Sequence, residues 1–288
     1  MTSAPARTFM TKPTRPTLKL PAGACDAHVH VMGPASRFPF ANVNLTKQDA
    51  PKEALFALHD FLGIEHCVIV HTTSHGTDNS TTADALAAKC GAYLGVALVQ
   101  TSISDAALKQ LDAQGFRGAR FHYMSHVALR EPIEAVIAFG ARLAKFGWHL
   151  QIHMAADLIG ELTPALLRSP VPVMIDHMGR VDASLGLDQP AFQNLLKLMD
   201  NKTIWVKVSG CDRASRAGPP YADAVPLARK LVAEFGDRCV WGTDWPHPNH
   251  DPPVPDDGLL VDLLAEIAPG AALQAVLVDN PRRFYGFK

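Results

Sequence analysis

The 288-residue sequence has few cysteines, no excess of charge of either sign and no long hydrophobic run. Its five cysteines are odd in number and never form C-x-x-C, which argues against a disulfide framework or a thiolate zinc site and fits a reducing cytoplasm. The formal net charge of −1 gives no global electrostatic reason to bind nucleic acid or an anionic membrane. No stretch approaches the roughly 20 apolar residues that a membrane span needs. We expect a cytoplasmic protein with neither partner; its oligomeric state stays open.

Several catalytic motifs are also absent. The chain has no Walker A loop, no G-x-G-x-x-G after a strand and no G-x-S-x-G nucleophile elbow. These absences argue against P-loop phosphoryl transfer, Rossmann dinucleotide binding and serine-hydrolase chemistry. The chemistry must therefore be sought in other residues.

Short apolar runs rich in β-branched residues alternate with Ala/Leu-rich segments of helical periodicity, which is typical of parallel strands joined by helices. The predicted strands are Cys25–His30, His66–His71, Leu94–Gln100, Arg117–Phe121, Trp148–His153, Val171–Asp176, Thr203–Val208 and Cys239–Thr243. The predicted helices are Pro51–Leu62, Thr81–Cys90, Ser104–Gln114, Glu131–Phe146, Leu158–Leu167, Gln189–Met199, Ala222–Phe235, Asp256–Ile267 and Ala271–Val278. This alternation predicts an α/β fold, a single (β/α)8 TIM-type barrel, which usually takes about 250 residues.

Residues 1–22 differ in composition from the rest of the chain. They carry four basic residues, four prolines and no acidic residue. The prolines interrupt any continuous amphipathic helix of the targeting type. We predict a flexible N-terminal arm over residues 1–22 and the barrel over residues 23–288.

Imidazole and carboxylate groups stand where predicted strands end. Active sites of such barrels lie at the C-terminal ends of the strands. His28 and His30 close the first strand, and side chains at i and i+2 of a strand point to the same side. His153 and His177 end or follow the fifth and sixth strands, and Asp244 follows the eighth. Two neighbouring histidines alone are weak evidence for a site. Together with the other groups they predict a metal or oxyanion site.

Three arginines have a similar placement. Arg120, Arg180 and Arg213 end or just follow predicted strands rather than lying on helix faces. A guanidinium group matches a carboxylate bidentately, and each arginine alone fits a structural salt bridge equally well. Together they predict a small anionic substrate.

Collinear motifs carry a resemblance to a known family. They are Asp26–His30, Gly33–Pro34 with Phe38–Phe40, His75–Asn79, Asp176–Arg180, Gly242–Asn249 and Asp279–Tyr285. By these motifs the chain resembles the amidohydrolase superfamily, in the amidohydrolase-2 group that includes the 2-pyrone-4,6-dicarboxylate lactonases. The resemblance extends over nearly the whole chain after about residue 22. The resemblance implies a barrel lactonase or a related hydrolase.

The resemblance also implies roles for four residues. Asp244 would deprotonate the attacking water, while His28, His30 and His177 would polarise the lactone carbonyl and stabilise the developing oxyanion. The pyrone-dicarboxylate lactonases are understood to work without a metal. By this resemblance no cofactor is needed.

The substrate contacts are implied in the same way, with departures. The residues that match positions around the substrate's carboxylates are Arg120, Arg180 and Arg213, with Ser74 nearby. The sequence departs from the lactonase pattern at Asn42–Thr46, where a tyrosine is missing, at Ser125-His126, where an arginine is missing, and at His153, which replaces a tyrosine. These departures weaken the dicarboxylate assignment, and a sulfonated or sugar-acid lactone is also consistent with the sequence.

His153 is consistent with a metal site. Zinc-dependent members of the superfamily use the first-strand pair, a fifth-strand histidine and the eighth-strand aspartate, which here are His28, His30, His153 and Asp244. Such a set leaves a coordination position for a water whose pKa can fall to about 7. His177 would then polarise the carbonyl or accept a proton. The sequence leaves both versions open: no cofactor, or one divalent metal, zinc.

Other functions would use some of the same residues. A zinc-dependent decarboxylase or a sugar-acid lactone isomerase of the same superfamily would share the histidines. A non-catalytic barrel could bind an organic anion through the arginines alone. Such a binder has no need of three histidines together with Asp244, so the sequence favours hydrolysis of an anionic lactone.

Overall fold

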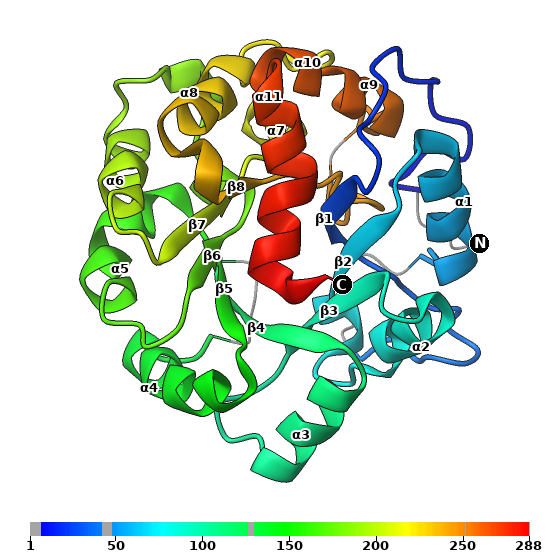
Figure 1. The fold of residues 1–288 in the computed structure, drawn as a ribbon, viewed down its shortest axis with the longest axis vertical. Coiled ribbons are helices and arrows are strands. Elements are labelled where there is room, and N and C mark those ends of the chain that lie inside the picture. The colour runs from blue at the N-terminus through cyan, green and yellow to red at the C-terminus, as the bar shows by residue number, and fades with distance from the viewer. Residues whose placement is uncertain (1–6, 42–47, 126–129, 251, 288) are drawn as a thin grey trace, which may run out of the picture.

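The eight predicted strands form one parallel sheet. The computed structural model describes residues 7–41, 48–125, 130–250 and 252–287. The strands are β1 (Cys25–Val29), β2 (His66–Val70), β3 (Tyr93–Leu98), β4 (Phe116–Tyr123), β5 (His149–Met154), β6 (Val173–Ile175), β7 (Ile204–Lys207) and β8 (Cys239–Val240). They follow one another in sequence order around a ring that helices surround (Figure 1). The predicted (β/α)8 barrel is confirmed.

The helices match the predicted periodicity. They are α1 (Lys52–Leu62), α2 (Ser80–Lys89), α3 (Asp105–Ala113), α4 (Ile133–Leu143), α5 (Ile159–Leu166), α6 (Pro190–Met199), α7 (Cys211–Ala214), α8 (Val225–Phe235), α9 (Asp257–Asp262), α10 (Leu264–Ile267) and α11 (Ala271–Gln274). In α1 the buried Leu55, Leu58 and Leu62 lie on one face at helical spacing. None of the helices in the described ranges is long and apolar enough to span a membrane.

Two helix predictions need correction. The predicted helix Asp256–Ile267 is divided into α9 and α10, and the short α7 in the loop after β7 was not predicted. The closing helix begins at Ala271 as expected but continues as π-helical turns at Ala275–Asp279 and Arg282–Gly286. The short α7 follows the C-terminal end of β7 and carries Arg213, and none of these differences changes the barrel architecture.

Backbone hydrogen bonds complete the ring between β1 and the segment that follows the short β8. The amide of Ala27 donates to the Trp241 carbonyl at 2.8 Å, and the amide of Asp244 donates to the His28 carbonyl at 2.8 Å. Because the backbone of Asp244 is hydrogen-bonded directly to β1, the first and last strands bring Asp244 next to His28.

Gly242 makes this close approach possible. A Cβ atom there would lie 2.4 Å from the backbone nitrogen of His28, a distance that no side chain can occupy. The buried Asp26 holds the same junction, since its carboxylate accepts hydrogen bonds from the Thr243 amide at 3.1 Å and the Thr243 hydroxyl at 2.6 Å. The motifs around β1 and β8 are therefore partners in space.

Aromatic residues of the C-terminal segment close the N-terminal mouth of the barrel. This segment, red in Figure 1, crosses the centre of the ring. The Phe284 ring lies 4.6 Å from that of Trp205 and 4.7 Å from that of His149, while Phe287 lies 4.9 Å from His66. His66 and His149 begin strands, so this plug leaves the opposite, C-terminal mouth for a site.

The predicted flexibility of the N-terminal arm is not confirmed. The described part of the arm is tied to the barrel, since the amide of Thr14 donates to Asp256 at 3.0 Å and that of Thr17 donates to Asp262 at 2.8 Å. The departures at Asn42–Thr46 and His126 lie outside the described residues.

Candidate active site

A cavity at the C-terminal ends of the strands gathers the predicted site residues. It is lined by His30, Thr72, Thr73, Ser74, Arg120, His122, His153, His177, Arg180, Arg213, Asp244, Pro248 and Asn249. Every predicted site residue except His28 lines it, and His28 is buried directly beside Asp244. The structure therefore brings the whole predicted set to one place.

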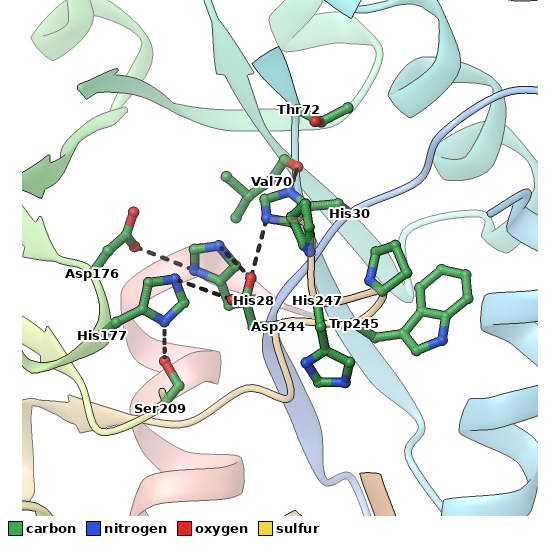
Figure 2. Close-up of polar contacts among 12 residues, drawn as sticks. His28, His30, Val70, Thr72, Asp176, His177, Ser209, Asp244, Trp245 and His247 are labelled. Atoms are coloured by element: carbon green, nitrogen blue, oxygen red, sulfur yellow. Dashed lines mark hydrogen bonds and ion pairs between the residues drawn. The ribbon is translucent and has the colours of Figure 1, made fainter. Parts of the chain in front are cut away.

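Asp244 occupies the centre of the site. Its backbone has a φ of +65°, a left-handed conformation that is rare outside glycine and clusters at functional sites. Arg213 Nε donates to Asp244 Oδ2 at 2.5 Å, while Oδ1 faces His30 Nε2 at 3.2 Å (Figure 2). Burial alone would raise the pKa of this carboxyl, but Arg213 and then His177 hold it well below its usual value. Asp244 is therefore ionised throughout the neutral range.

The tautomer of His30 follows from its backbone contact. Its Nδ1 lies 2.6 Å from the carbonyl oxygen of Val70, which can only accept, so Nδ1 carries a proton. In a neutral ring, Nε2 then presents a lone pair toward Asp244. Two acceptors 3.2 Å apart require a shared proton or a cation between them. This face of the site is built for one or the other.

His28 is held from beneath by charged groups. Its Nδ1 lies 3.1 Å from Lys207 Nζ and 3.3 Å from Asp176 Oδ1, and its Nε2 faces Asp244 Oδ1 at 3.7 Å. Burial and then the Lys207 charge hold the pKa of His28 well below its usual value. Within the described part of the chain, neither His28 Nε2 nor Asp244 Oδ1 has a hydrogen-bond partner.

His177 completes the imidazole group around Asp244. Its Nδ1 lies 3.0 Å from Ser209 Oγ and its Nε2 lies 3.8 Å from Asp244 Oδ2 (Figure 2). Gly210 packs so closely that a Cβ atom there would lie 2.9 Å from His177 Cβ. Burial lowers the pKa of His177 to about 4, so the ring is neutral at neutral pH.

The three arginines differ in their pairing. Arg120 Nε donates to Asp176 at 2.8 Å, and Arg213 Nε donates to Asp244. Arg180 makes no ion pair with a described carboxylate within 4 Å, although it lines the same cavity. Burial and the neighbouring Arg213 lower the pKa of Arg180 to about 10, which leaves it charged at neutral pH. Arg180 is therefore the cation most available to an incoming anion.

The predicted four-residue metal set is only partly assembled. Among the described residues, the group close enough to share an ion consists of His28, His30 and Asp244, whose ligand atoms lie within 4.8 Å of one another. His153 does not belong to this group, and its Nδ1 lies 3.2 Å from His122 Nδ1. The three remaining donors, with their unpartnered atoms, still fit a divalent ion and leave coordination positions for water.

Sequence reasoning missed part of the floor of the site. Lys207 and Gln151 are fully buried there, and the buried Asp176 pairs with Arg120. Burial lowers the pKa of Lys207 to about 8, so it keeps its charge at neutral pH. A signal was present in the sequence: Lys207 interrupts an apolar strand, where an ionic group without a partner would be costly.

Comparisons with known proteins agree with this geometry. A family model described as Amidohydrolase matches residues 25–287. A 2-pyrone-4,6-dicarboxylate hydrolase from Comamonas testosteroni is 46% identical over 95% of this chain and 93% of its own length. A 4-sulfomuconolactone hydrolase from Hydrogenophaga intermedia is 38% identical over 93% of this chain and 90% of its own. A solved structure from Pseudomonas putida, described as a candidate 2-pyrone-4,6-dicarboxylic acid hydrolase, has a TM-score of 0.82, 31% identity and 93% and 99% coverage of the two chains.

Proposed function

The chain belongs to the amidohydrolase family, and from that premise we propose that it hydrolyses an anionic lactone by water attack on the ring carbonyl. The observation that carries the proposal is the buried, ionised Asp244 beside three imidazoles, with the charged Arg180 on the same cavity. The two similar hydrolases named above act on anionic lactones by their names, which supports the same class of substrate.

The proposed role of each residue follows from its charge. Arg180 binds the carboxylate or sulfonate of the lactone, because it forms no ion pair with a carboxylate among the described residues. His28, His30 and His177 surround Asp244, and those ring nitrogens that carry a proton donate to the carbonyl oxygen, where negative charge develops. Arg213 keeps Asp244 ionised and in place.

The reaction balances with these groups alone. Water oxygen bonds to the carbonyl carbon while Asp244 accepts the proton that the water loses. The ring C–O bond then breaks, and the leaving ring oxygen takes that proton. The new carboxylic acid ionises at neutral pH, so one proton is released for each ring opened.

A divalent ion fits the same donors. His28, His30 and Asp244 would hold it, and it would lower the pKa of a bound water. Elemental analysis of fully active protein purified without chelator tests this point. Near-stoichiometric zinc supports the ion, and full activity with essentially no divalent metal rejects it.

The decisive experiment compares lactones. Purified protein is supplied with 2-pyrone-4,6-dicarboxylate, 4-sulfomuconolactone and an aldonolactone, and ring opening is followed by loss of ring absorbance and by alkali uptake. We expect opening of an anionic lactone with one equivalent of alkali consumed. Carbon dioxide release would instead identify a decarboxylase, and anion binding without turnover would identify a binding protein.

The sulfonated lactone is included because of another part of the cavity lining, formed by Arg120, His122 and His153. There the charge of Arg120 is already balanced by Asp176, and the cavity presents the contacting imidazoles of His122 and His153. Burial and Arg120 hold the pKa of His153 well below its usual value, so this ring is neutral. This part of the cavity suits a second substrate group that needs a cationic partner less than a carboxylate does.

A further inference from the structure

We propose that Lys207 is a positioning residue that fixes His28 in the tautomer with its proton on Nε2. In this form His28 donates a hydrogen bond toward the lactone carbonyl. The inference rests on the proposed lactone hydrolysis for its consequence, but the tautomer itself can be measured without any substrate.

The contacts of the Lys207 ammonium group carry the argument. Its side chain is fully buried on β7, and Nζ lies 2.9 Å from the Ala27 carbonyl oxygen, 3.0 Å from Gln151 Oε1 and 3.1 Å from His28 Nδ1. An ammonium group has three N–H donors and no acceptor, and these are its three shortest contacts, while Asp176 Oδ1 lies farther away at 3.5 Å. His28 Nδ1 therefore accepts a hydrogen bond.

The second nitrogen of His28 follows from the first. A neutral imidazole that accepts at Nδ1 carries its proton on Nε2. That atom faces Asp244 Oδ1 at 3.7 Å, which is too long for a hydrogen bond, and it has no other partner among the described residues. The N–H group is therefore available to an oxygen that enters beside Asp244.

Asp176 offers the competing arrangement. Its Oδ1 lies 3.3 Å from His28 Nδ1, and if it accepted a proton there, His28 Nε2 would present a lone pair suited to a metal ion. Its other oxygen already accepts from Arg120 Nε at 2.8 Å and from Gln151 Nε2 at 3.2 Å. Lys207 makes the shorter contact to His28 Nδ1 and so determines the tautomer.

This competition links one buried lysine to the chemistry of the site. With Lys207 in place, His28 is a donor to the developing oxyanion, and a divalent ion that used His28 as a ligand would first have to displace the proton from Nε2. Without it, Asp176 becomes the acceptor for Nδ1, and His28 joins His30 and Asp244 as a ligand. Lys207 is fully buried and its Nζ contacts His28 Nδ1, whereas His28 Nε2 faces Asp244, so Lys207 acts through His28.

The primary test is 15N NMR of the imidazoles in the unsubstituted, metal-free protein, with the His28 signals assigned by their loss in His28→Gln. We expect the proton on Nε2. A proton on Nδ1 would overturn the proposal, whether or not the protein opens any lactone, so this failure is distinct from failure of the proposed function.

The second test is Lys207→Met, which keeps the length of the side chain and removes its donors. We expect the His28 proton to move to Nδ1, kcat to fall about 10²-fold with KM little changed, and zinc affinity to rise by about tenfold or more. Lys197→Met on the exposed face of α6 is the matched control and should change none of these values. An unchanged tautomer in Lys207→Met would refute the role of Lys207.

Discussion

At the residue scale, the proposed chemistry depends most directly on Asp244. Replacing it with asparagine keeps the size of the side chain and an oxygen that can accept from Arg213 Nε, but removes the proton acceptor. For Asp244→Asn we expect kcat to fall about 10²- to 10⁴-fold, the usual contribution of a general base. Steady-state kinetics gives the loss, and calorimetric titration with the lactone should show that binding is largely kept.

The control for this substitution is Asp105→Asn. Asp105 is an exposed acid on α3 whose partner is Arg142 at 2.6 Å, and surface changes of this kind usually have small effects. Its turnover should match that of the parent protein. Parent-like turnover in Asp244→Asn would remove Asp244 from the mechanism.

Arg180 is expected to affect binding more than turnover. Because it has no carboxylate partner among the described residues, Arg180→Gln should raise KM for an anionic lactone about 10- to 100-fold, the loss of one charge-assisted contact, while kcat changes less. Steady-state kinetics at low and high salt measures the change in KM. The KM of the parent protein should depend more strongly on salt than the KM of the variant.

Arg168→Gln serves as the matched control, since Arg168 is exposed and pairs with Glu134 at 2.7 Å. Its KM should equal that of the parent. If Arg180→Gln also kept the parent KM, the substrate's anionic group would have to be held elsewhere.

At the scale of elements, the junction of β1 with the segment after β8 depends on Gly242. In Gly242→Ala the new Cβ would meet the His28 backbone nitrogen at 2.4 Å, and neither segment can yield without moving His28 or Asp244. We expect a loss of about 1–3 kcal/mol or more in the free energy of unfolding, the range for overpacking, together with a loss of activity. Urea unfolding followed by circular dichroism measures the stability.

Gly236→Ala is a direct control for that change. Gly236 has a φ of −57° and open space around its Cβ position, so alanine fits without strain. Its stability should be equal to or slightly above that of the parent. Equal stabilities of the two variants would contradict the proposed close approach at Gly242.

The same junction shows what the sequence could predict at this scale. Strands were predicted within a few residues because β-branched runs and helical periodicity are local signals. The eighth strand was predicted to run to Thr243 but ends at Val240, because the chain then turns against β1 and Asp244 adopts a positive φ. Such a turn depends on a partner far away in the sequence.

The sequence predicted the site residues that stand at the ends of strands. It did not predict the buried residues that lie beneath them. His30, His177 and Asp244 lie together as predicted, because parallel strands bring their ends to one mouth. Lys207 and Gln151 were missed because their meeting under His28 depends on how three strands align across the barrel. The pairing of His153 with His122, rather than with the ligand group, depends on the same register, in which these residues are partners on β4 and β5.

At the scale of the whole molecule, the barrel buries several histidines in their neutral form, and this couples its stability to pH. Burial is the main cause that lowers the pKa of His71 and of His149 to about 3 and that of His177 to about 4. Between these values and the unfolded value near 6.5, the unfolded chain binds protons that the folded protein excludes. Stability therefore rises with pH across this window and is lost as pH falls below about 6.5. His247, whose pKa is raised chiefly by Asp257 against the effect of burial, acts in the opposite sense.

Each of the three histidines contributes a slope of at most about 1.4 kcal/mol per pH unit, so we expect the free energy of unfolding to fall clearly between pH 7 and pH 5. Urea unfolding at the two pH values measures it. In His149→Gln one titrating group is removed at the plugged mouth, far from Asp244, so the difference between the two pH values should become smaller. Equal unfolding free energies at pH 7 and pH 5 in the parent protein would mean that these buried rings take up protons in the folded state as readily as in the unfolded chain.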